Sequence, residues 1–426
     1  MLANAEMSLP KRSREYMAEP ILDWILNGIP RPVNVKLFDD VSFIYEAQLA
    51  KMELSAWWDN LEEFRKRAAY YEEVNGKKTY HHYISAIRGK GQIGRTNQYL
   101  THWYYPYKAK FHPQMVKALI NWMGLKRGQK LLDPFAGSGT ALIESKLIGV
   151  DSLGIDIDPF CILMSRVKSD LLDLEPDSLT EIPLKTAFEY LKTFKGKSHQ
   201  VGLTKFVEAT SGESPFSGMD ERVSEFFLLS YLYALSDFTY IKKDMWKAFH
   251  KNTSEILKGI EMFSELKTQL DLSMGKAEVR QGDARFLEKA GIPTGSIDGI
   301  VTSPPYSIAV DYIANDRHTF KYLGIEEDAL QDELVGLKGK HEDRIRIYFE
   351  DMRLAFRSMF DALKVGAKCA VLIGDVTFEG QRLPITQGFI EIAEKVGFHL
   401  VNVIKRPILG GFARLRYEYI ILLEKP

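Results

Sequence analysis

The sequence predicts an α/β fold in which a mostly parallel sheet presents a ligand site at the carboxyl ends of its strands. Two short strings support this prediction. Residues 133–140, Asp-Pro-Phe-Ala-Gly-Ser-Gly-Thr, form a glycine-rich turn, and residues 302–306, Thr-Ser-Pro-Pro-Tyr, end a second apolar run. The first string is typical of a cofactor-binding turn. The second indicates a pocket for an amino group on a flat ring.

The glycine-rich turn stands between a predicted strand and a predicted helix. The apolar run Lys130–Leu132 precedes it, and residues 141–148 follow with helical spacing. Gly137 and Gly139 let the backbone approach a ligand closely, because glycine has no Cβ. The helix N-terminus behind them presents amides without intrahelical partners. This arrangement predicts a cofactor site.

Two carboxylates narrow the class of cofactor. Asp156 ends the next strand, residues 152–158, about twenty residues after the turn, where an acid can accept hydrogen bonds from ribose hydroxyls. The nicotinamide pattern Gly-x-Gly-x-x-Gly is absent. Asp133 at the strand tip instead suits a ligand that carries a free ammonium group, as S-adenosylmethionine does.

The second string predicts the chemistry. A strand over residues 295–302 ends at two consecutive prolines, which stop the strand and stiffen the loop. Hydrogen bonds from an aromatic amine to the Ser303 side chain and the Pro304 carbonyl would direct its lone pair at a methyl sulfonium. If the flat ring is a base of a nucleic acid, Tyr306 can stack on it. Such a base must leave the duplex, because pairing and stacking bury its amino group there.

With these motifs, the chain resembles the S-adenosylmethionine-dependent DNA amino-methyltransferases, the family that makes N4-methylcytosine and N6-methyladenine. A third match, residues 105–113, resembles another cofactor segment of that family. The resemblance implies the catalytic residues Ser303, Pro304, Pro305 and Tyr306. It also implies the cofactor-binding residues Lys110, Phe111, Asp133, Pro134, Phe135, Ala136, Gly137, Ser138, Gly139, Thr140, Asp156, Ile157, Asp283 and Ala284.

The resemblance further implies a Rossmann-like class I methyltransferase core. We expect a mostly parallel seven-stranded sheet, closed by an antiparallel pair at 398–406 and 416–425. Helical spacing predicts a helical N-terminal extension and a helical insertion with helices over 223–233 and 253–272. The expected units are a helical extension with a basic loop (1–95), the first part of the core (96–164), the insertion (165–275) and the second part of the core (276–426). The insertion is a candidate target-recognition module or, equally, an oligomer interface.

Composition excludes several other classes. The 426 residues are 45% hydrophobic, enough for a substantial core, and no stretch approaches a membrane span. The N-terminus lacks a secretory signal, so a prokaryotic cytoplasmic protein is expected. Only two cysteines occur, Cys161 and Cys369, and neither lies in a Pro-Cys loop. No metal site is expected, and methylation at ring carbon five, which needs a thiolate, is disfavoured.

The net charge of −1 conceals a basic segment. From Val74 to Leu132, 59 residues, there is no Asp or Glu, whereas Lys and Arg total eleven, interleaved with tyrosines, histidines and Trp103. Such a mixture fits phosphate contacts and base stacking, and double-stranded DNA is the expected partner. The alternative is a solvated surface with core aromatics. The candidate DNA-binding residues are Lys90, Arg95, Lys108 and Arg414.

Three functions remain open at this point. The first is a DNA amino-methyltransferase, favoured for N4 of cytosine because Ser303 stands where adenine enzymes more often carry Asp or Asn. It would work in restriction–modification or phage defence with a cognate restriction endonuclease. The second is an RNA enzyme that methylates an amino group of tRNA guanine. The third is a DNA-binding protein that has lost activity, which the intact motifs disfavour.

Overall fold

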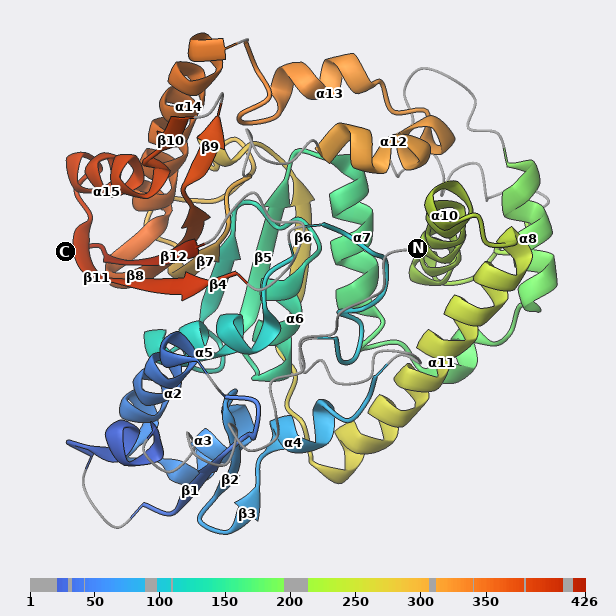
Figure 1. Ribbon diagram of the computed structural model, residues 1–426. Coiled ribbons are helices and arrows are strands. Elements are labelled where there is room, and N and C mark those ends of the chain that lie inside the picture. Colours follow the sequence, from blue (N-terminus) through green and yellow to red (C-terminus); the bar gives the residue numbers. More distant parts are fainter. Residues whose placement is uncertain are drawn as a thin grey trace, which may run out of the picture.

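The computed structural model describes residues 21–29, 33–41, 43–88, 98–108, 110–194, 214–305, 312–339, 341–378, 381–408 and 417–426. Figure 1 shows a central sheet with helices on both sides and a smaller N-terminal unit at one end. Among the described residues, no helix combines the length and the apolarity that a membrane crossing needs.

The central sheet has seven strands in the order β11-β12-β8-β7-β4-β5-β6. Strands β4 to β8 pair in parallel, and β12 runs antiparallel to both β8 and β11. The expected seven-stranded class I sheet with its closing antiparallel pair is confirmed. The strands are β4 (Lys130–Asp133), β5 (Asp151–Asp156), β6 (Ala277–Gln281), β7 (Ile297–Thr302), β8 (Leu363–Gly374), β11 (His399–Pro407) and β12 (Tyr417–Glu424).

Alternation along the strands divides the core between the two faces of the sheet. Leu131 lies in one buried cluster and Leu132 in another, because successive side chains of a strand point to opposite faces. Helix α5 (Pro113–Met123) packs into the cluster that contains Leu131. Helices α14 (His341–Ala362) and α15 (Ile385–Val396) pack into the cluster that contains Leu132. The remaining core elements are α6 (Thr140–Leu147), α7 (Pro159–Asp170), the 3₁₀ turn Ala284–Phe286 and the hairpin β9 (Val376–Phe378) with β10 (Gln381–Leu383).

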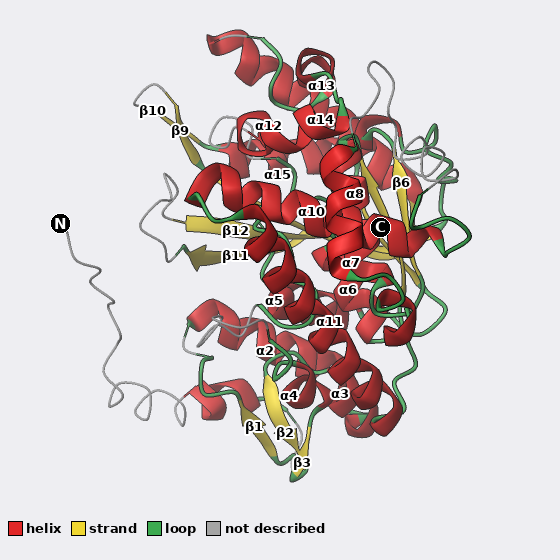
Figure 2. Cartoon of the chain, turned by 90° about the vertical axis from the view of Figure 1, so that its right-hand side faces the viewer, coloured by secondary structure: helices red, strands yellow, loops and turns green. Residues whose placement is uncertain are grey.

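The N-terminal unit is helical, as expected, but it also contains a three-stranded antiparallel sheet that the sequence reading did not predict. This sheet lies at the end of the molecule away from α12 and α13 (Figures 1 and 2). Its strands are too short to show an alternating pattern. The elements are β1 (Val35–Leu37), β2 (Tyr71–Val74), β3 (Lys77–Lys78), α2 (Ile44–Trp57), α3 (Leu61–Arg67) and α4 (Tyr80–Ile84).

A buried carboxylate joins this unit to the core. Glu53 of α2 accepts hydrogen bonds from the backbone amides of Ala69 and Tyr70 and from the side chain of Asn121 in α5. Burial raises the pKa of Glu53 to about 7. Arg67 adds a second link, since its guanidinium donates to the Asn121 side chain at 2.7 Å and to the Leu125 carbonyl.

The insertion between β5 and β6 is helical in its described part, as predicted. Helix α10 (Glu221–Ile241) contains the expected segment 223–233 and extends beyond it. Helix α11 (Met245–Gln269) begins before the expected segment 253–272 and ends three residues before its predicted end. Phenylalanine and tyrosine side chains of α10 join the same buried cluster as Phe160 and Val167 of α7. The other elements of this side are the 3₁₀ turn Pro176–Leu179, α8 (Leu184–Thr193), α12 (Tyr312–Leu323) and α13 (Glu327–Glu333).

Candidate active site

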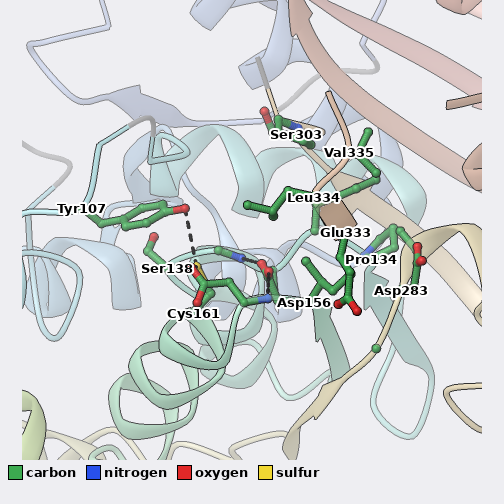
Figure 3. Close-up of a pocket in the computed structure, with 18 of the residues that line it drawn as sticks. Tyr107, Pro134, Ser138, Asp156, Cys161, Asp283, Ser303, Glu333, Leu334 and Val335 are labelled. Carbon is green, nitrogen blue, oxygen red and sulfur yellow. Dashed lines mark hydrogen bonds between the residues drawn. The ribbon is translucent and has the colours of Figure 1, made fainter. Parts of the chain in front are cut away.

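A pocket of about 940 Å³, including the solvent at its mouth, opens at the carboxyl ends of β4, β5 and β7. Strands β4 and β7 are neighbours from which the chain builds the sheet outward in opposite directions, so the pocket lies at the topological switch point. Figure 3 shows Tyr107, Asp156, Ser303 and Glu333 converging on it from distant parts of the sequence.

Most of the candidate site residues line this pocket. They are Lys110, Phe111, Pro134, Phe135, Ala136, Gly137, Ser138, Thr140, Asp156, Ile157, Asp283, Ala284, Ser303 and Pro305. Asp133, Gly139 and Pro304 lie outside the lining. Gly139 is the N-cap of α6, where a Cβ would stand 2.8 Å from Cβ of Ser165, so this glycine lets α6 and α7 pack closely. Tyr306 falls outside the described residues.

The glycine-rich turn is held by the carboxylate at the end of β5. Asp156 accepts a hydrogen bond from the amide of Gly137 at 2.8 Å and another from the amide of Asp158 at 3.0 Å. Gly137 has φ +48°, a conformation that favours glycine. Burial raises the pKa of Asp156. The Ile157 amide also donates to this carboxylate, so one of its four lone pairs is left to accept a hydroxyl of a ribose.

The ends of β4 and β7 are joined by side chains. The Thr302 hydroxyl donates to Oδ1 of Asp133 at 2.7 Å, and that oxygen also accepts the Phe135 amide at 3.2 Å. The other oxygen of Asp133 is buried and has no hydrogen-bond partner among the described residues. Burial raises the pKa of Asp133 to about 7. In this structure Asp133 fixes the two strand tips that carry the site.

The candidate catalytic loop, which begins at Ser303, is held by hydrogen bonds from two directions. The Ser303 hydroxyl donates to the Leu372 carbonyl of β8 at 3.2 Å, and the Tyr348 hydroxyl of α14 donates to the Pro305 carbonyl at 3.1 Å. A serine hydroxyl has one proton and two acceptor lone pairs. Because its proton is directed at Leu372, the Ser303 oxygen presents itself to the pocket as an acceptor.

Lys110 supports the pocket wall from behind. Its ammonium donates to the carbonyls of His102 at 2.9 Å and Tyr105 at 2.7 Å, which fixes the turn before the cofactor segment. Burial lowers the pKa of Lys110 to about 7. Phe111 follows it on the lining.

The basic, aromatic stretch does not form the stacking surface that we considered, and that expectation is wrong for most of its members. Seven of its aromatic side chains are buried, whereas Tyr83 is exposed. The buried ones are Tyr80, His81, Tyr99, His102, Trp103, Tyr104 and Tyr105. Lys117 is buried as well and pairs with Glu144 of α6 at 3.1 Å, beside Tyr99 and His102, which contact the same carboxylate. These groups satisfy one another inside the core, which agrees with the alternative of core aromatics.

The four candidate DNA-binding residues have different outcomes. Lys108 is exposed, and its ammonium hydrogen-bonds to the Asn315 side chain of α12 near the catalytic loop. Lys90, Arg95 and Arg414 lie outside the described residues. A role of Lys108 in binding DNA stays a prediction.

Several pocket residues were missed by the sequence reading. Asp158 lines the pocket and caps α7 by accepting the Phe160 amide at 2.8 Å. Its position two residues after Asp156 was a usable signal. The segment Glu333–Val335 lines the opposite side, and nothing in its local sequence marks it as part of a site.

The polar segment that contains Asp316 and His318 lies on α12, behind Tyr105. The Tyr105 hydroxyl donates to Asp316 at 2.8 Å and lies 3.2 Å from Nε2 of His318. Burial lowers the pKa of His318 to about 4. The imidazole is therefore uncharged near neutral pH.

The lining of the pocket fits S-adenosylmethionine in chemistry, because it combines apolar walls with carboxylates. Asp156, Asp283 and Glu333 line it, whereas Lys110 is the one cation among the lining residues. An excess of carboxylates suits a ligand that carries an ammonium and a sulfonium charge.

The fold and the pocket define a Rossmann-like class I methyltransferase. The family model "UPF0020: RMKL-like, methyltransferase domain" matches residues 103–196. The chain is 22% identical to Type II methyltransferase M.BsoBI of Geobacillus stearothermophilus, over 72% of this chain and 80% of that protein. It is also 22% identical to Type II methyltransferase M.MjaII of Methanocaldococcus jannaschii, over 75% and 78%.

A shorter match concerns a different kind of enzyme. Over 73 residues, the chain is 34% identical to a tRNA (guanine(10)-N2)-dimethyltransferase of Methanothermobacter thermautotrophicus, covering 17% of this chain and 21% of that protein. Together, the matches confirm the resemblance to the S-adenosylmethionine-dependent DNA amino-methyltransferase family, and with it the cofactor.

The first prediction concerns pH. Burial, followed by the charge of Asp156, raises the pKa of Asp158 to about 8. From about pH 4 to about pH 8 the folded state therefore holds a proton that the unfolded state has lost. The free energy of unfolding is therefore highest at the lower end of this range and falls as the pH rises, by up to about 1.4 kcal/mol per pH unit. Asp158→Asn keeps an N-cap acceptor but cannot titrate, so its free energy of unfolding should fall less steeply.

Urea unfolding between pH 5 and pH 8, which lies inside this range, measures the difference in slope. Asp244→Asn is the matched control, because Asp244 also caps a helix but is exposed. Parallel profiles for wild type and Asp158→Asn would show that Asp158 is not buried as a neutral group.

Proposed function

We propose that the protein is a site-specific DNA methyltransferase that transfers a methyl group to the exocyclic amino group of a flipped-out base, N4 of cytosine. The observation that carries this proposal is the orientation of Ser303 at the pocket lined by the cofactor turn. Its hydroxyl proton is engaged by Leu372, which leaves the oxygen to accept an N–H of the target amine.

The chain's own groups would prepare the amine for attack. S-adenosylmethionine supplies an electrophilic methyl group on its sulfonium. The Ser303 oxygen and the Pro304 carbonyl accept hydrogen bonds from the two N–H groups of the amine. These hydrogen bonds move the nitrogen toward tetrahedral geometry and aim its lone pair at the methyl group. The new nitrogen–methyl bond forms as the sulfur–methyl bond breaks, and the nitrogen then loses a proton to water. His318, neutral and next to Tyr105, is not needed as the base.

DNA is proposed as the substrate because of how much of the chain each kind of relative matches. The two Type II methyltransferases match 72% and 75% of this chain, whereas the tRNA enzyme matches 17%. The base must leave the duplex to reach the pocket. We assign target recognition to the insertion of residues 165–275, and we assign Lys108 to a contact with a DNA phosphate. The proposed setting is a prokaryotic cytoplasmic restriction–modification or phage-defence system with a cognate endonuclease.

Two alternatives follow from specific observations. N6 of adenine would use the same loop and the same amine chemistry, so the preference for cytosine rests on Ser303 alone. The amino group of guanine in tRNA is the second alternative, because 73 residues of the chain are 34% identical to a tRNA (guanine(10)-N2)-dimethyltransferase. Both alternatives retain the mechanism and change the substrate.

The substrate class is tested by methyl transfer from tritiated S-adenosylmethionine. Unmethylated duplex DNA should incorporate label, and bulk tRNA should stay at background. Gly137→Asp is the control for cofactor dependence, because a carboxylate at residue 137 would stand against Asp156, which accepts from the same residue at 2.8 Å. Label in tRNA and none in DNA would overturn the DNA proposal while keeping the enzyme class.

The role of Ser303 is tested by Ser303→Ala. Removal of one pre-organised polar contact at a reacting group typically costs about 100-fold or more in rate, so we expect kcat to fall by about that factor. The dissociation constant for the cofactor should stay the same. Ser296→Ala, one residue before β7 and outside the pocket lining, is the matched control. A Ser303→Ala enzyme with the wild-type rate would refute the amine-positioning mechanism.

A further inference from the structure

Arg285 stands at the centre of an ion-pair cluster beside the pocket. It follows Asp283 and Ala284, which line the pocket, and its side chain is only 9% exposed. Its guanidinium bonds both oxygens of Asp283, with distances of 2.7 Å and 2.9 Å, and reaches Asp351 of α14 at 2.8 Å. A planar guanidinium can hold several acceptors in a fixed arrangement, which a lysine cannot do.

The same guanidinium also holds a distant segment of backbone. It donates to the Glu333 carbonyl at 3.1 Å, 48 residues further along the chain. Glu333, Leu334 and Val335 all line the pocket. Leu334 packs against the cluster that contains Phe160, while Val335 is buried in the cluster that contains Leu132. The segment therefore bridges two cores across the pocket.

The side chain of Glu333 is placed to meet a ligand. Figure 3 shows it reaching into the pocket that Asp156 also lines. Within the described part of the chain, the Glu333 carboxylate has no hydrogen-bond or ion-pair partner, whereas Asp156 and Asp283 already accept from protein groups. An ionised carboxylate accepts hydrogen bonds and attracts a cation.

We propose that Glu333–Val335, fixed by Arg285, is a wall of the cofactor site, and that the Glu333 carboxylate contacts the nucleoside half of S-adenosylmethionine. The contacts of Arg285 indicate which half of the ligand meets this segment. Arg285 ties the segment to Asp283, which follows β6, and β6 pairs with β5, the strand that ends at Asp156. Donors of the nucleoside, its hydroxyls and its amino group, match a carboxylate acceptor. Arg285 acts as a positioning residue, and Glu333 contacts the ligand.

The test is direct binding of S-adenosylmethionine and S-adenosylhomocysteine by isothermal titration calorimetry. Glu333→Gln should weaken the binding of both ligands by about tenfold, the factor that corresponds to about 1.4 kcal/mol. Asp332→Asn is the matched control, since Asp332 is the adjacent exposed carboxylate and does not line the pocket. Equal dissociation constants for Glu333→Gln and wild type would overturn the ligand contact.

Arg285→Lys tests the positioning role. We expect weaker cofactor binding together with faster hydrogen exchange at the amides of 334–337, which a role confined to global stability would not localise there. Arg346→Lys, on the exposed side of α14, is the control. Unchanged exchange and unchanged binding would overturn the role of Arg285. If Arg285→Lys does not fold, Glu333→Gln still decides the proposal, because Glu333 is exposed.

This inference depends on the proposed function only through the cofactor, so the two fail separately. Wild-type binding of S-adenosylmethionine with no effect of Glu333→Gln would refute the wall alone. Binding that responds to Glu333→Gln in a protein that methylates no DNA would refute the proposed substrate and keep the wall.

Discussion

The hydrogen bond from the Thr302 hydroxyl to Asp133 ties together the two strands on which the site is built. It spans 2.7 Å between the ends of β7 and β4, at the switch point of the sheet. The residue after Asp133 begins the glycine-rich turn, and the residue after Thr302 begins the proline loop. This one contact therefore sets the separation between the turn and the loop. The other oxygen of Asp133 is buried without a hydrogen-bond partner in the part of the chain that the structure describes, the kind of costly arrangement that occurs at functional sites.

A second buried carboxylate supports the cofactor turn from behind. Burial alone would raise the pKa of Glu144, but Lys117 and His102 outweigh it and lower the pKa to about 2. Glu144 lies on α6, the helix that follows the turn, and Tyr99 donates to it. The acid-free stretch thus supplies the positive and aromatic groups that balance one internal charge. A shortage of acids in a sequence window does not reveal whether its lysines face solvent or a carboxylate elsewhere in the chain.

The parts predicted correctly are those that local sequence determines. The strands, the glycine-rich turn and the proline loop follow from apolar runs and from the fixed φ of proline, and the parallel sheet brings their ends together. What escaped prediction depends on contacts between distant residues. Glu333 lines the pocket in a segment whose carbonyl accepts a hydrogen bond from Arg285, 48 residues earlier in the chain, and β1–β3 are too short to carry a periodic signal. Asp133 lies outside the pocket lining and accepts the Thr302 hydroxyl, a contact between two strands that no local pattern predicts, and its contact with a ligand stays a prediction.

The central claim is that the pocket transfers a methyl group to an exocyclic amino nitrogen of a DNA base. Mass spectrometry of the nucleosides from DNA incubated with the protein and S-adenosylmethionine tests it most directly. The account predicts N4-methyldeoxycytidine. N6-methyldeoxyadenosine would keep the amine chemistry and correct the base. 5-Methyldeoxycytidine, or DNA without any methylated base, would contradict the account.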